Sequence, residues 1–344
     1  MTASTHSKSG KRRQSTESPI VPLVAAIIPC FREREHILGV LSGIGPEVQR
    51  IYVIDDACPD GTGKLVEDES NDERVQVHVN AANLGVGGAT LAGYRIALED
   101  GADILVKLDG DGQMDPTLIP QLIQPVLSGE ADYAKGNRFH TMDGVSGMPL
   151  ARIIGNFFLS FASKLSSGYW NIFDPTNGYT ALHAEAAGRL PLDRLSEGYF
   201  FESDMLFHLG LMRAVVRDVP MRAVYGNEQS GIRIPKIIPE FLAKHYINTC
   251  KRVFFTYFVR EANFATLQLV LGKLLLLFGL VFGAIHWIDG EITGVPATAG
   301  TVVLAALPII IGSQLLIAFL SYDTRNVPTT PLQTLRISQG SVTD

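Results

Sequence analysis

Two carboxylates separated by one residue follow a short apolar run near the middle of the chain. Asp109 and Asp111 come directly after residues 104–108, and Gln113 stands at the next odd position. If the apolar run is a buried strand, both carboxylates lie at its end and can turn toward one point. Hard oxygen donors of this kind select Mg²⁺ or Mn²⁺, which in turn bind a diphosphate. The segment therefore predicts a metal site, with Gln113 as a third ligand or in contact with one.

A calcium-binding EF-hand loop is a rival interpretation of the same acids. Such a loop, starting at Asp109, needs Gly at its sixth position and Glu at its twelfth. The sequence has Met114 and Pro120 at these positions, which excludes the EF-hand. A structural turn rich in Asp and Gly stays as the plain alternative.

A second pair of acids also follows an apolar run. Asp55 and Asp56 come after residues 51–54 and precede a Pro-Asp-Gly turn. Asp56 is a candidate acceptor for a base N–H or a ribose hydroxyl. Either acid alone has an equally good structural interpretation, because an aspartate at this position often caps the following helix.

Two weaker signals point to a nucleotide. After Pro29, the ring of Phe31 could pack on a nucleobase and Glu33 could accept a hydrogen bond from it. The glycine-rich segment that includes Gly85 fails the dinucleotide-binding fingerprint, because the third small residue falls on Thr90. We expect this segment to be a loop that lets the backbone approach a nucleotide.

The elements that must position these residues follow from the hydrophobic pattern. Short apolar runs, suited to burial in a parallel sheet, alternate with helical stretches. This alternation is typical of a doubly wound α/β domain, in which ligands bind beyond the carboxyl ends of the strands. We expect strands at residues 23–28, 51–54, 75–79 and 104–108, and helices at residues 34–41, 63–69 and 89–98.

The last third of the chain has a different character. Residues 267–288 are almost wholly apolar, with Lys273 as the one charge, and residues 295–320 carry no charge. About 20 apolar residues span a bilayer core as a helix, so both runs qualify. Basic residues flank the pair, while the link between the runs holds Asp289 and Glu291. The positive-inside rule then predicts an integral membrane protein with its catalytic domain and both termini in the cytoplasm. A buried hairpin in a soluble protein is the alternative.

Composition limits the class of protein. The chain has 344 residues, and its 29 Lys and Arg against 35 Asp and Glu give a net charge of −6. This acidic balance argues against a nucleic-acid-binding protein. Three scattered cysteines are too few for a disulfide scaffold or a Cys-rich zinc site. The mean hydropathy of +0.17 is high for a soluble enzyme, and the excess lies in the two apolar runs.

Taken together, these segments resemble glycosyltransferase family 2, and within it the dolichol-phosphate mannose synthase-like branch of polyprenyl-phosphate glycosyltransferases. Residues 28–33 are similar to the family's Pro-x-aromatic-Asn-Glu opening, with Arg32 in place of Asn. Residues 53–62 are similar to its Val-Ile-Asp-Asp-x-Ser-x-Asp-Gly-Thr segment, with Cys58 in place of Ser. Residues 109–113 match its Asp-x-Asp-x-Gln motif.

The resemblance covers roughly residues 22–235 and implies a GT-A fold. This is an α/β domain that binds a nucleotide sugar through Mg²⁺ or Mn²⁺ and inverts the anomeric centre. By resemblance, the metal ligands are Asp109, Asp111 and Gln113. By resemblance too, the nucleotide sugar is lined by Pro29, Phe31, Glu33, Asp55, Asp56, Gly85 and Asp109.

Later segments are also similar to those of the family. Glu202 and Asp204 stand where the family has Gln and Glu, and are candidate catalytic acids together with Arg138 and Arg152. The resemblance implies a site for an acceptor phosphate formed by Arg138, Arg152, Asn156 and Asn177. Surface ion pairs are the alternative for the two arginines, and a helix cap or ion pair is the alternative for Asp204.

The sequence therefore predicts a membrane-anchored inverting glycosyltransferase. It would move a sugar from a UDP- or GDP-linked donor to a polyprenyl phosphate of the dolichyl or undecaprenyl type. That acceptor is already an anion and needs no strong general base. The alternative is transfer to a hydroxyl of a lipid-linked glycan or glycolipid, for which Asp204 or Glu202 would take the proton. A homo-oligomer is compatible with the sequence.

The same interpretation divides the chain into five segments and places it in a plasma or cytoplasmic membrane, or in the endoplasmic reticulum of a eukaryote. These segments are a disordered tail (1–19), a GT-A domain (20–233), amphipathic juxtamembrane helices (234–264), a transmembrane hairpin (265–322) and a C-terminal tail (323–344).

Overall fold

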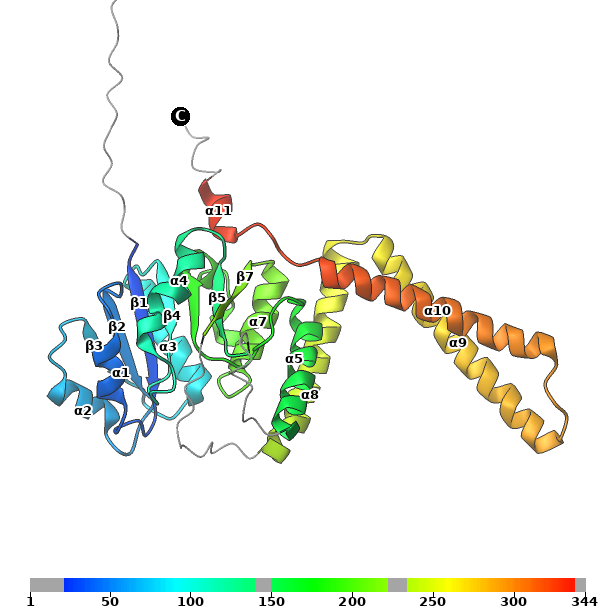
Figure 1. Cartoon of the computed structure of the whole chain (residues 1–344), viewed down its shortest axis with the longest axis horizontal. Coiled ribbons are helices and arrows are strands. Elements are labelled where there is room, and N and C mark those ends of the chain that lie inside the picture. Colours follow the sequence, from blue (N-terminus) through cyan, green and yellow to red (C-terminus); the bar gives the residue numbers. More distant parts are fainter. Residues whose placement is uncertain (1–21, 140–149, 222–233, 338–344) are drawn as a thin grey trace, which may run out of the picture.

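The computed structural model describes residues 22–139, 150–221 and 234–337, so the predicted tail at residues 1–19 lies outside the described residues. Within the described residues, seven strands form one sheet in the order β3-β2-β1-β4-β6-β5-β7 (Figure 1). The strands are β1 (Val24–Cys30), β2 (Arg50–Asp55), β3 (Val75–Val79), β4 (Ile104–Lys107), β5 (Tyr133–Asn137), β6 (Thr180–His183) and β7 (Val216–Pro220).

The sheet is mixed rather than parallel throughout. Strands β1 to β4 pair in parallel, as the alternating pattern predicts, but β6 runs antiparallel to both β4 and β5. The edge strand β3 is only half-buried, because it has a neighbour on one side. The carboxyl ends of β1, β2, β4 and β5 and the amino end of β6 consequently meet at one edge. Lys107 and Lys135 both pair with Thr180 there.

Helices cover both faces of the sheet and enclose two apolar cores. One core lies under α3 (Gly85–Glu99), α6 (Ala184–Ala187), α7 (Phe201–Met212) and the C-terminal α11 (Leu332–Ile337). The other lies under α1 (Ile37–Gly43), α2 (Thr62–Glu69) and α4 (Ile119–Leu127). The short 3₁₀ turns are η1 (Pro116–Leu118) and η3 (Leu192–Arg194). The part of the chain predicted as a C-terminal tail thus includes a helix that packs on the sheet domain.

Two long helices, α5 (Leu150–Ser167) and α8 (Ile234–Phe254), lie side by side at the margin of this domain (Figure 1). The ring Nδ1 of His245 on α8 is 2.8 Å from Ser166 Oγ on α5. Burial lowers the pKa of His245 to about 4, so the ring packs between the helices in its neutral form.

Helices α5 and α8 are both amphipathic, but they bury their polar faces and expose their apolar faces, and we call this an inverted pair. On α8 the buried face is polar and includes His245, Asn248 and Arg252. Its exposed apolar side chains include Leu242 and Tyr246, and Tyr246 is 71% exposed. A helix of a soluble domain normally buries its apolar face, so the outward face of α8 is suited to an apolar environment.

Helix α5 repeats this arrangement with smaller polar residues. Its buried side chains include four serines, Ser160, Ser163, Ser166 and Ser167, while its exposed side chains are Ile154, Phe157, Phe158 and Phe161. The exposed aromatic residues of α5 and the apolar residues of α8 belong to neighbouring helices. The expectation of amphipathic helices thus extends to α5, which the sequence prediction did not include.

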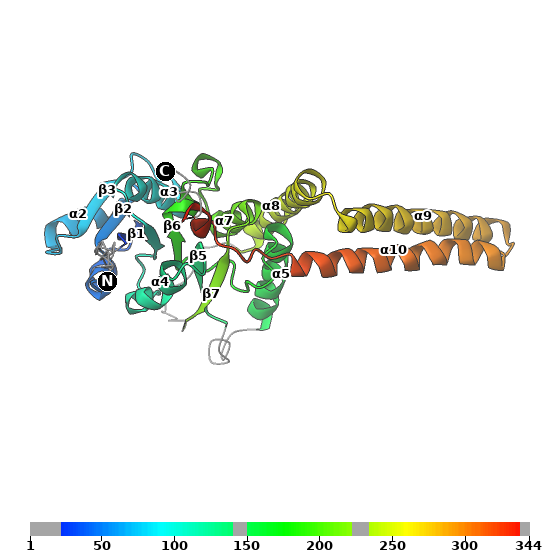
Figure 2. The ribbon, with the colours of Figure 1, turned by 90° about the horizontal axis from the view of Figure 1, so that it is seen from above.

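Beyond a π-helical turn, η4 (Phe255–Arg260), the chain forms a hairpin of α9 (Phe264–Thr293) and α10 (Ala299–Arg325) that projects away from the sheet domain (Figure 2). Their 18-residue apolar windows have mean hydropathies of 2.1 and 2.4 and are 17% and 11% buried. At 1.5 Å per residue, helices of this length exceed the roughly 30 Å of a bilayer core. Both are candidate membrane spans by length and composition.

Glycines let the two hairpin helices approach closely. A Cβ atom at Gly279 would lie 2.7 Å from the carbonyl oxygen of Ala305, and one at Gly312 would lie 2.7 Å from the backbone nitrogen of Leu276. Small residues at such crossings are typical of helix pairs in membranes, where close van der Waals packing replaces the hydrophobic driving force.

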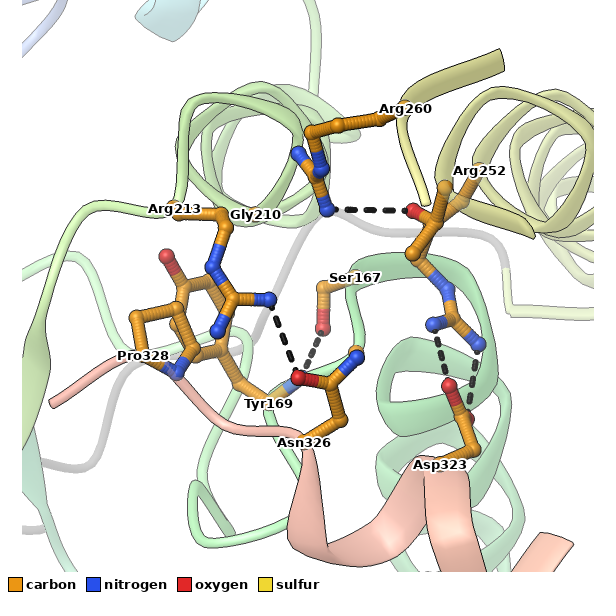
Figure 3. Close-up of a pocket in the computed structure, with 11 residues that line it drawn as sticks. Ser167, Tyr169, Gly210, Arg213, Arg252, Arg260, Asp323, Asn326 and Pro328 are labelled. Carbon is orange, nitrogen blue, oxygen red and sulfur yellow. Dashed lines mark hydrogen bonds and ion pairs between the residues drawn. The ribbon is translucent and has the colours of Figure 1, made fainter. Parts of the chain in front are cut away.

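One carboxylate fastens the hairpin to the sheet domain. Asp323, near the end of α10, accepts two hydrogen bonds from the guanidinium of Arg252, at 2.8 and 2.9 Å (Figure 3). It also accepts from Tyr257 Oη at 2.6 Å and from Trp170 Nε1 at 3.0 Å. Arg252 in turn donates from Nε to the carbonyl oxygen of Leu165 on α5. The hairpin, α8 and α5 therefore share one buried charge network.

Replacing Asp323 by Asn should destabilise the full-length protein strongly, because Arg252 would then be buried without its counter-charge. Breaking a buried pair in this way costs about 3–5 kcal/mol. The midpoint of thermal unfolding in detergent micelles measures the effect. Glu240→Gln is the matched control, since its ion pair with Lys244 is exposed and such pairs contribute less than about 1 kcal/mol. Equal midpoints for the two variants would contradict the assigned role of Asp323.

Candidate functional site

The predicted metal motif leaves β4 at the edge where the strand ends meet. Gly110 packs it against the loop that follows β1, because a Cβ atom there would lie 3.1 Å from Cys30 Sγ and 3.5 Å from Glu33 Cβ. The Asp-Gly-Asp motif and the segment from Phe31 to Glu33 are thus brought together, as the sequence predicts. Glycine at position 110 keeps this contact close.

Asp109 has a buried cation beside it. The Nζ atom of Lys107 lies 2.8 Å from Asp109 Oδ1 and 3.3 Å from Glu202 Oε1 at the start of α7. Burial opposes the charge on Lys107, but the two carboxylates outweigh it and raise the pKa of the ammonium group above its ordinary value. Asp109, Lys107 and Glu202 therefore form one charged row at the edge of the sheet.

The residues of the motif have the donor chemistry that Mg²⁺ or Mn²⁺ prefers. Asp109 and Asp111 are both half-buried and supply carboxylate oxygens, and Gln113 is exposed. The backbone N–H of Gln113 donates to Asp111 Oδ1 at 3.0 Å. Gly178 lets Lys107 and Asp109 approach the backbone, since a Cβ atom there would lie 3.1 Å from Asp109 Oδ2 and would clash with Lys107 Nζ. The donor set suits a hard divalent ion.

Asp55 and Asp56 are both buried, and their oxygens bind backbone. Asp55 accepts from the N–H groups of Cys58 and Gly63 at 2.7 Å, which holds the turn into α2. Asp56 accepts from Leu84 N at 2.9 Å, from Gly85 N at 2.8 Å and from Asn80 Nδ2 at 2.8 Å. Asp55 therefore caps the following helix, as the structural alternative expected, whereas Asp56 holds the start of α3. Their contact with a nucleotide stays a prediction.

The glycine-rich segment is not the loop that we expected. Helix α3 begins at Gly85, four residues before the predicted start, and the glycines meet the segment that leads into α7. Gly88 N donates to the carbonyl oxygen of Glu197 at 3.0 Å, and a Cβ atom at Gly87 would lie 2.8 Å from that same oxygen. Close approach of two backbones accounts for these glycines.

The segment after β1 presents an aromatic ring at the edge. Pro29 is buried within β1, whereas Phe31 is 40% exposed with the guanidinium of Arg32 5.4 Å from its ring centroid. Arg32 has a φ of 66°, in the left-handed region that asparagine tolerates better than other non-glycine residues. Asparagine, which the resembling family has at this position, would adopt this conformation at a lower cost than Arg32.

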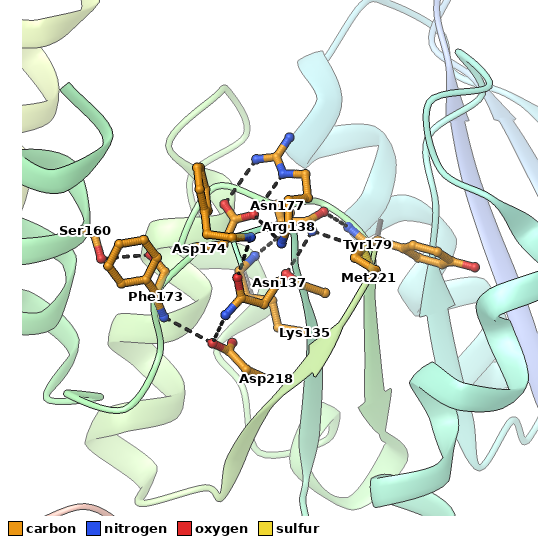
Figure 4. A network of polar contacts seen from close by, with 12 residues as sticks. Lys135, Asn137, Arg138, Ser160, Phe173, Asp174, Asn177, Tyr179, Asp218 and Met221 are labelled. Atoms are coloured by element: carbon orange, nitrogen blue, oxygen red, sulfur yellow. Dashed lines mark hydrogen bonds and ion pairs between the residues drawn. The ribbon is translucent and has the colours of Figure 1, made fainter. Parts of the chain in front are cut away.

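Arg138, predicted to bind an acceptor phosphate, is held by a buried acid. Its Nε lies 2.8 Å from Asp174 Oδ2 and its Nη2 lies 3.1 Å from Asp174 Oδ1 (Figure 4). The pair is bidentate, with the Asp174 side chain fully buried and that of Arg138 36% exposed. Asp174 thus fixes the orientation of a guanidinium group that still reaches the surface.

Asn177 lies beside this pair but has a structural role. It is 2% exposed, its Nδ2 donates to the carbonyl oxygen of Gly136 at 2.8 Å, and its Oδ1 accepts from Tyr179 N at 3.0 Å. Its side chain consequently ties the loop to β5, and its contact with an acceptor phosphate stays a prediction. Arg152 and Asn156 lie on α5, where Asn156 is half-buried, and the side chain of Arg152 lies outside the described residues.

The two candidate acids of α7 point to different partners. Glu202 belongs to the charged row with Lys107. Asp204 accepts from Ser196 N at 3.0 Å and from Asn248 Nδ2 of α8 at 3.1 Å, so both of its oxygens are engaged. Asp204 thus fastens α7 to α8, and its role as a general base stays a prediction.

Comparison with known proteins identifies the family. Residues 25–190 match the family described as glycosyl transferase family 2. The undecaprenyl-phosphate mannosyltransferase of Micrococcus luteus is 34% identical to this chain over 206 residues, which are 58% of this chain and 83% of that protein. This chain belongs to glycosyltransferase family 2.

Other family 2 relatives and a solved structure agree. The UDP-N-acetylglucosamine–dolichyl-phosphate N-acetylglucosaminyltransferase of Methanococcus voltae is 31% identical over 59% of this chain and 86% of its own length. The polyprenol monophosphomannose synthase of Mycolicibacterium smegmatis is 34% identical over 52% and 69%. A glucosyl-3-phosphoglycerate synthase of Mycobacterium tuberculosis, solved with Mn²⁺, UDP and phosphoglyceric acid, is 18% identical, with a TM-score of 0.51 over 67% and 78%. The last likeness shows the GT-A fold.

The sequence alone assigned no individual role to four charged residues near this edge. Lys107, Lys135 and Asp174 are buried and Asp218 is half-buried (Figure 4 shows the last three). Asp218 accepts from Asn137 Nδ2 at 2.8 Å, and burial raises its pKa. For the lysines a signal was present, because each interrupts an otherwise uncharged strand.

Asp56→Ala tests the structural role of the acid pair. The variant removes the acceptor for Leu84, Gly85 and Asn80 and should lower the free energy of unfolding by about 2–4 kcal/mol, since hydrogen bonds to a buried carboxylate are among the stronger ones. Thermal or urea unfolding of the nucleotide-free protein measures this change. Asp60→Ala, in the exposed turn nearby, should stay within about 0.5 kcal/mol. If Asp56→Ala were as stable as the unaltered protein, the structural role of Asp56 would be contradicted.

Proposed function

We propose that this glycosyltransferase moves a sugar from a nucleotide-sugar donor to the phosphate of a polyprenyl phosphate in the membrane. The observation that carries the proposal is the position of the inverted α5–α8 pair next to the site. Ser160 on α5 donates to the carbonyl oxygen of Phe173 at 2.8 Å, and the Phe173 ring packs on Phe139, directly after Arg138. The names of the M. luteus, M. voltae and M. smegmatis relatives support the same acceptor class.

On the donor side, Asp109, Asp111 and Gln113 are the proposed ligands of Mg²⁺ or Mn²⁺. When bound, such an ion stabilises the charge of the leaving nucleoside diphosphate. Phe31 and Glu33 would contact the base of a UDP- or GDP-linked donor. Asp55, Asp56, Pro29 and Gly85 would shape the donor site through the backbone that they hold.

On the acceptor side, Arg138, Arg152 and Asn156 are the proposed phosphate contacts. A guanidinium group matches a phosphate with two parallel hydrogen bonds. The bidentate contact with Asp174 restricts the rotation of the Arg138 side chain, so less conformational entropy is lost when a phosphate binds. Catalysis would then rest on positioning and charge neutralisation.

The geometry favours a phosphate acceptor over a sugar hydroxyl. A hydroxyl must lose its proton to a general base, whereas a phosphate is already an anion. Both oxygens of Asp204 accept hydrogen bonds from Ser196 and Asn248, and Glu202 is paired with Lys107. Glu202 and Asp204 are also buried, at 8% and 9% exposure, so an acceptor that needs no base suits this site better.

The membrane arrangement follows from the same surfaces. In this proposal α9 and α10 span the bilayer, the GT-A domain of residues 20–233 and both termini lie in the cytoplasm, and α5 and α8 rest their apolar faces on the membrane surface. In Figure 1 the hairpin leaves the α5–α8 pair at a steep angle, so helices that span the bilayer would leave that pair lying along it.

The test is turnover of labelled UDP- and GDP-sugars by the full-length protein in membranes, with polyprenyl phosphate and Mn²⁺. We expect a labelled lipid that is soluble in chloroform and labile to mild acid, formed with one donor. Asp111→Asn should lower its formation by roughly 10²-fold or more, because a contact to the developing charge is lost. Chelation should abolish turnover, and added Mn²⁺ should restore it.

Two outcomes would contradict this function. If label appeared on an added glycan but never on polyprenyl phosphate, the acceptor would be a sugar hydroxyl. Full activity of Asp111→Asn would contradict the role of Asp111 as a metal ligand. Asp68→Asn, at an exposed position of α2 outside these motifs, is the control variant and should turn over at the rate of the unaltered protein.

A further inference from the structure

Lys107 is a charged residue at the end of a strand that is otherwise apolar, and its side chain is 1% exposed. Its Nζ lies 2.8 Å from Asp109 Oδ1, 3.3 Å from Glu202 Oε1 and 3.4 Å from the carbonyl oxygen of Gly178. One ammonium group is thus shared between the first acid of the metal motif and an acid of α7. Sequence reasoning assigned no role to it.

A fixed positive charge at this place opposes a divalent cation. A cation bound to Asp109 and Asp111 would lie within a few ångströms of the ammonium group, in surroundings where charges interact more strongly than in water. An exposed lysine swings into solvent to relieve such repulsion, but Lys107 is enclosed. Among the described residues, Glu202 supplies the one other carboxylate within ion-pair distance of Lys107.

We propose that Lys107 is the internal counter-charge of the metal motif. In the nucleotide-free protein it occupies Asp109 and weakens the binding of a divalent cation. When a nucleoside diphosphate arrives, its negative charges compensate both cations, and the ammonium group shifts toward Glu202. This inference rests on the proposed function and deepens it, because it makes binding of the metal ion depend on the presence of the nucleotide.

Lys135 provides a matched comparison within the same structure. It is also buried, and it pairs with Thr180 from the other side of β6. Its Nζ donates to the carbonyl oxygen of Asn177, and among the described residues no carboxylate lies within ion-pair distance of it. Removing Lys135 therefore removes a buried lysine near the site without removing the counter-charge of Asp109.

The experiment measures Mn²⁺ binding alone, by electron paramagnetic resonance of free Mn²⁺ and by calorimetry, with the full-length protein in detergent. Lys107→Met should bind Mn²⁺ at least about tenfold more tightly than the unaltered protein when no nucleotide is present. Lys107→Arg should restore weak binding, and Lys135→Met should stay within about twofold. Adding UDP or GDP should reduce the difference between Lys107→Met and the unaltered protein.

If Lys107 merely oriented Asp109, removing it would weaken Mn²⁺ binding instead of strengthening it. Unchanged or weaker Mn²⁺ binding by Lys107→Met therefore overturns the inference. Glu202→Gln tests it independently should Lys107→Met fail to fold, as shown by its thermal unfolding. With Glu202 neutral, the ammonium group stays on Asp109, and Mn²⁺ should bind several-fold more weakly; unaltered or tighter binding overturns the inference. Absence of Mn²⁺ binding by the unaltered protein even with UDP and GDP would overturn the proposed metal site itself.

Discussion

Negative charge gathered at one edge of a sheet is the constraint on which the rest of this structure depends. Buried or half-buried carboxylates are stable only when hydrogen bonds or cations compensate them. Asp55 and Asp56 are compensated by backbone N–H groups, and Asp109 and Asp174 by Lys107 and Arg138. The first two hold the turns that lead into α2 and α3. The last two are paired with Lys107 and Arg138, which in the proposed function lie beside the metal ion and the acceptor phosphate. The framework and the chemistry are therefore built from the same type of contact.

The same constraint governs the attachment of the membrane hairpin. Asp323 gathers Arg252, Tyr257 and Trp170 from three parts of the chain. The polar side chains of α5 and α8 pack inward, and their aromatic and aliphatic side chains face outward. This arrangement suits helices that lie beside a bilayer, because lipid can cover an apolar outer face. The edge that holds Asp109 and the α5–α8 pair are consequently parts of one packed body.

Much of this architecture is legible in the sequence, and the exceptions have physical causes. Parallel strands β1 to β4 and the two candidate spans follow from hydrophobic periodicity, which is local. Several charged pairs join residues that are far apart in the chain, and only the fold brings them together. Arg138 and Asp174 are 36 residues apart, Asp204 and Asn248 are 44 apart, and Lys107 and Glu202 are 95 apart. The glycines at the start of α3 pack on the segment near Glu197, which lies more than a hundred residues away in the chain. Local sequence cannot show this contact, so it predicts a nucleotide-binding loop there instead. The hydrophobic pattern of α5 is misleading, because sequence analysis assumes that an apolar helix face is buried.

The central claim is that one charge-compensated edge binds metal and nucleotide together next to the membrane. A high-resolution cryo-electron microscopy map of the full-length protein in lipid nanodiscs with Mn²⁺ and a nucleoside diphosphate tests it most directly. The account predicts an ion in contact with Asp109 and Asp111, the Lys107 ammonium group moved onto Glu202, and the exposed aromatic side chains of α5 against the lipid. An ion held elsewhere, with Lys107 still on Asp109 and α5 in solvent, would contradict it.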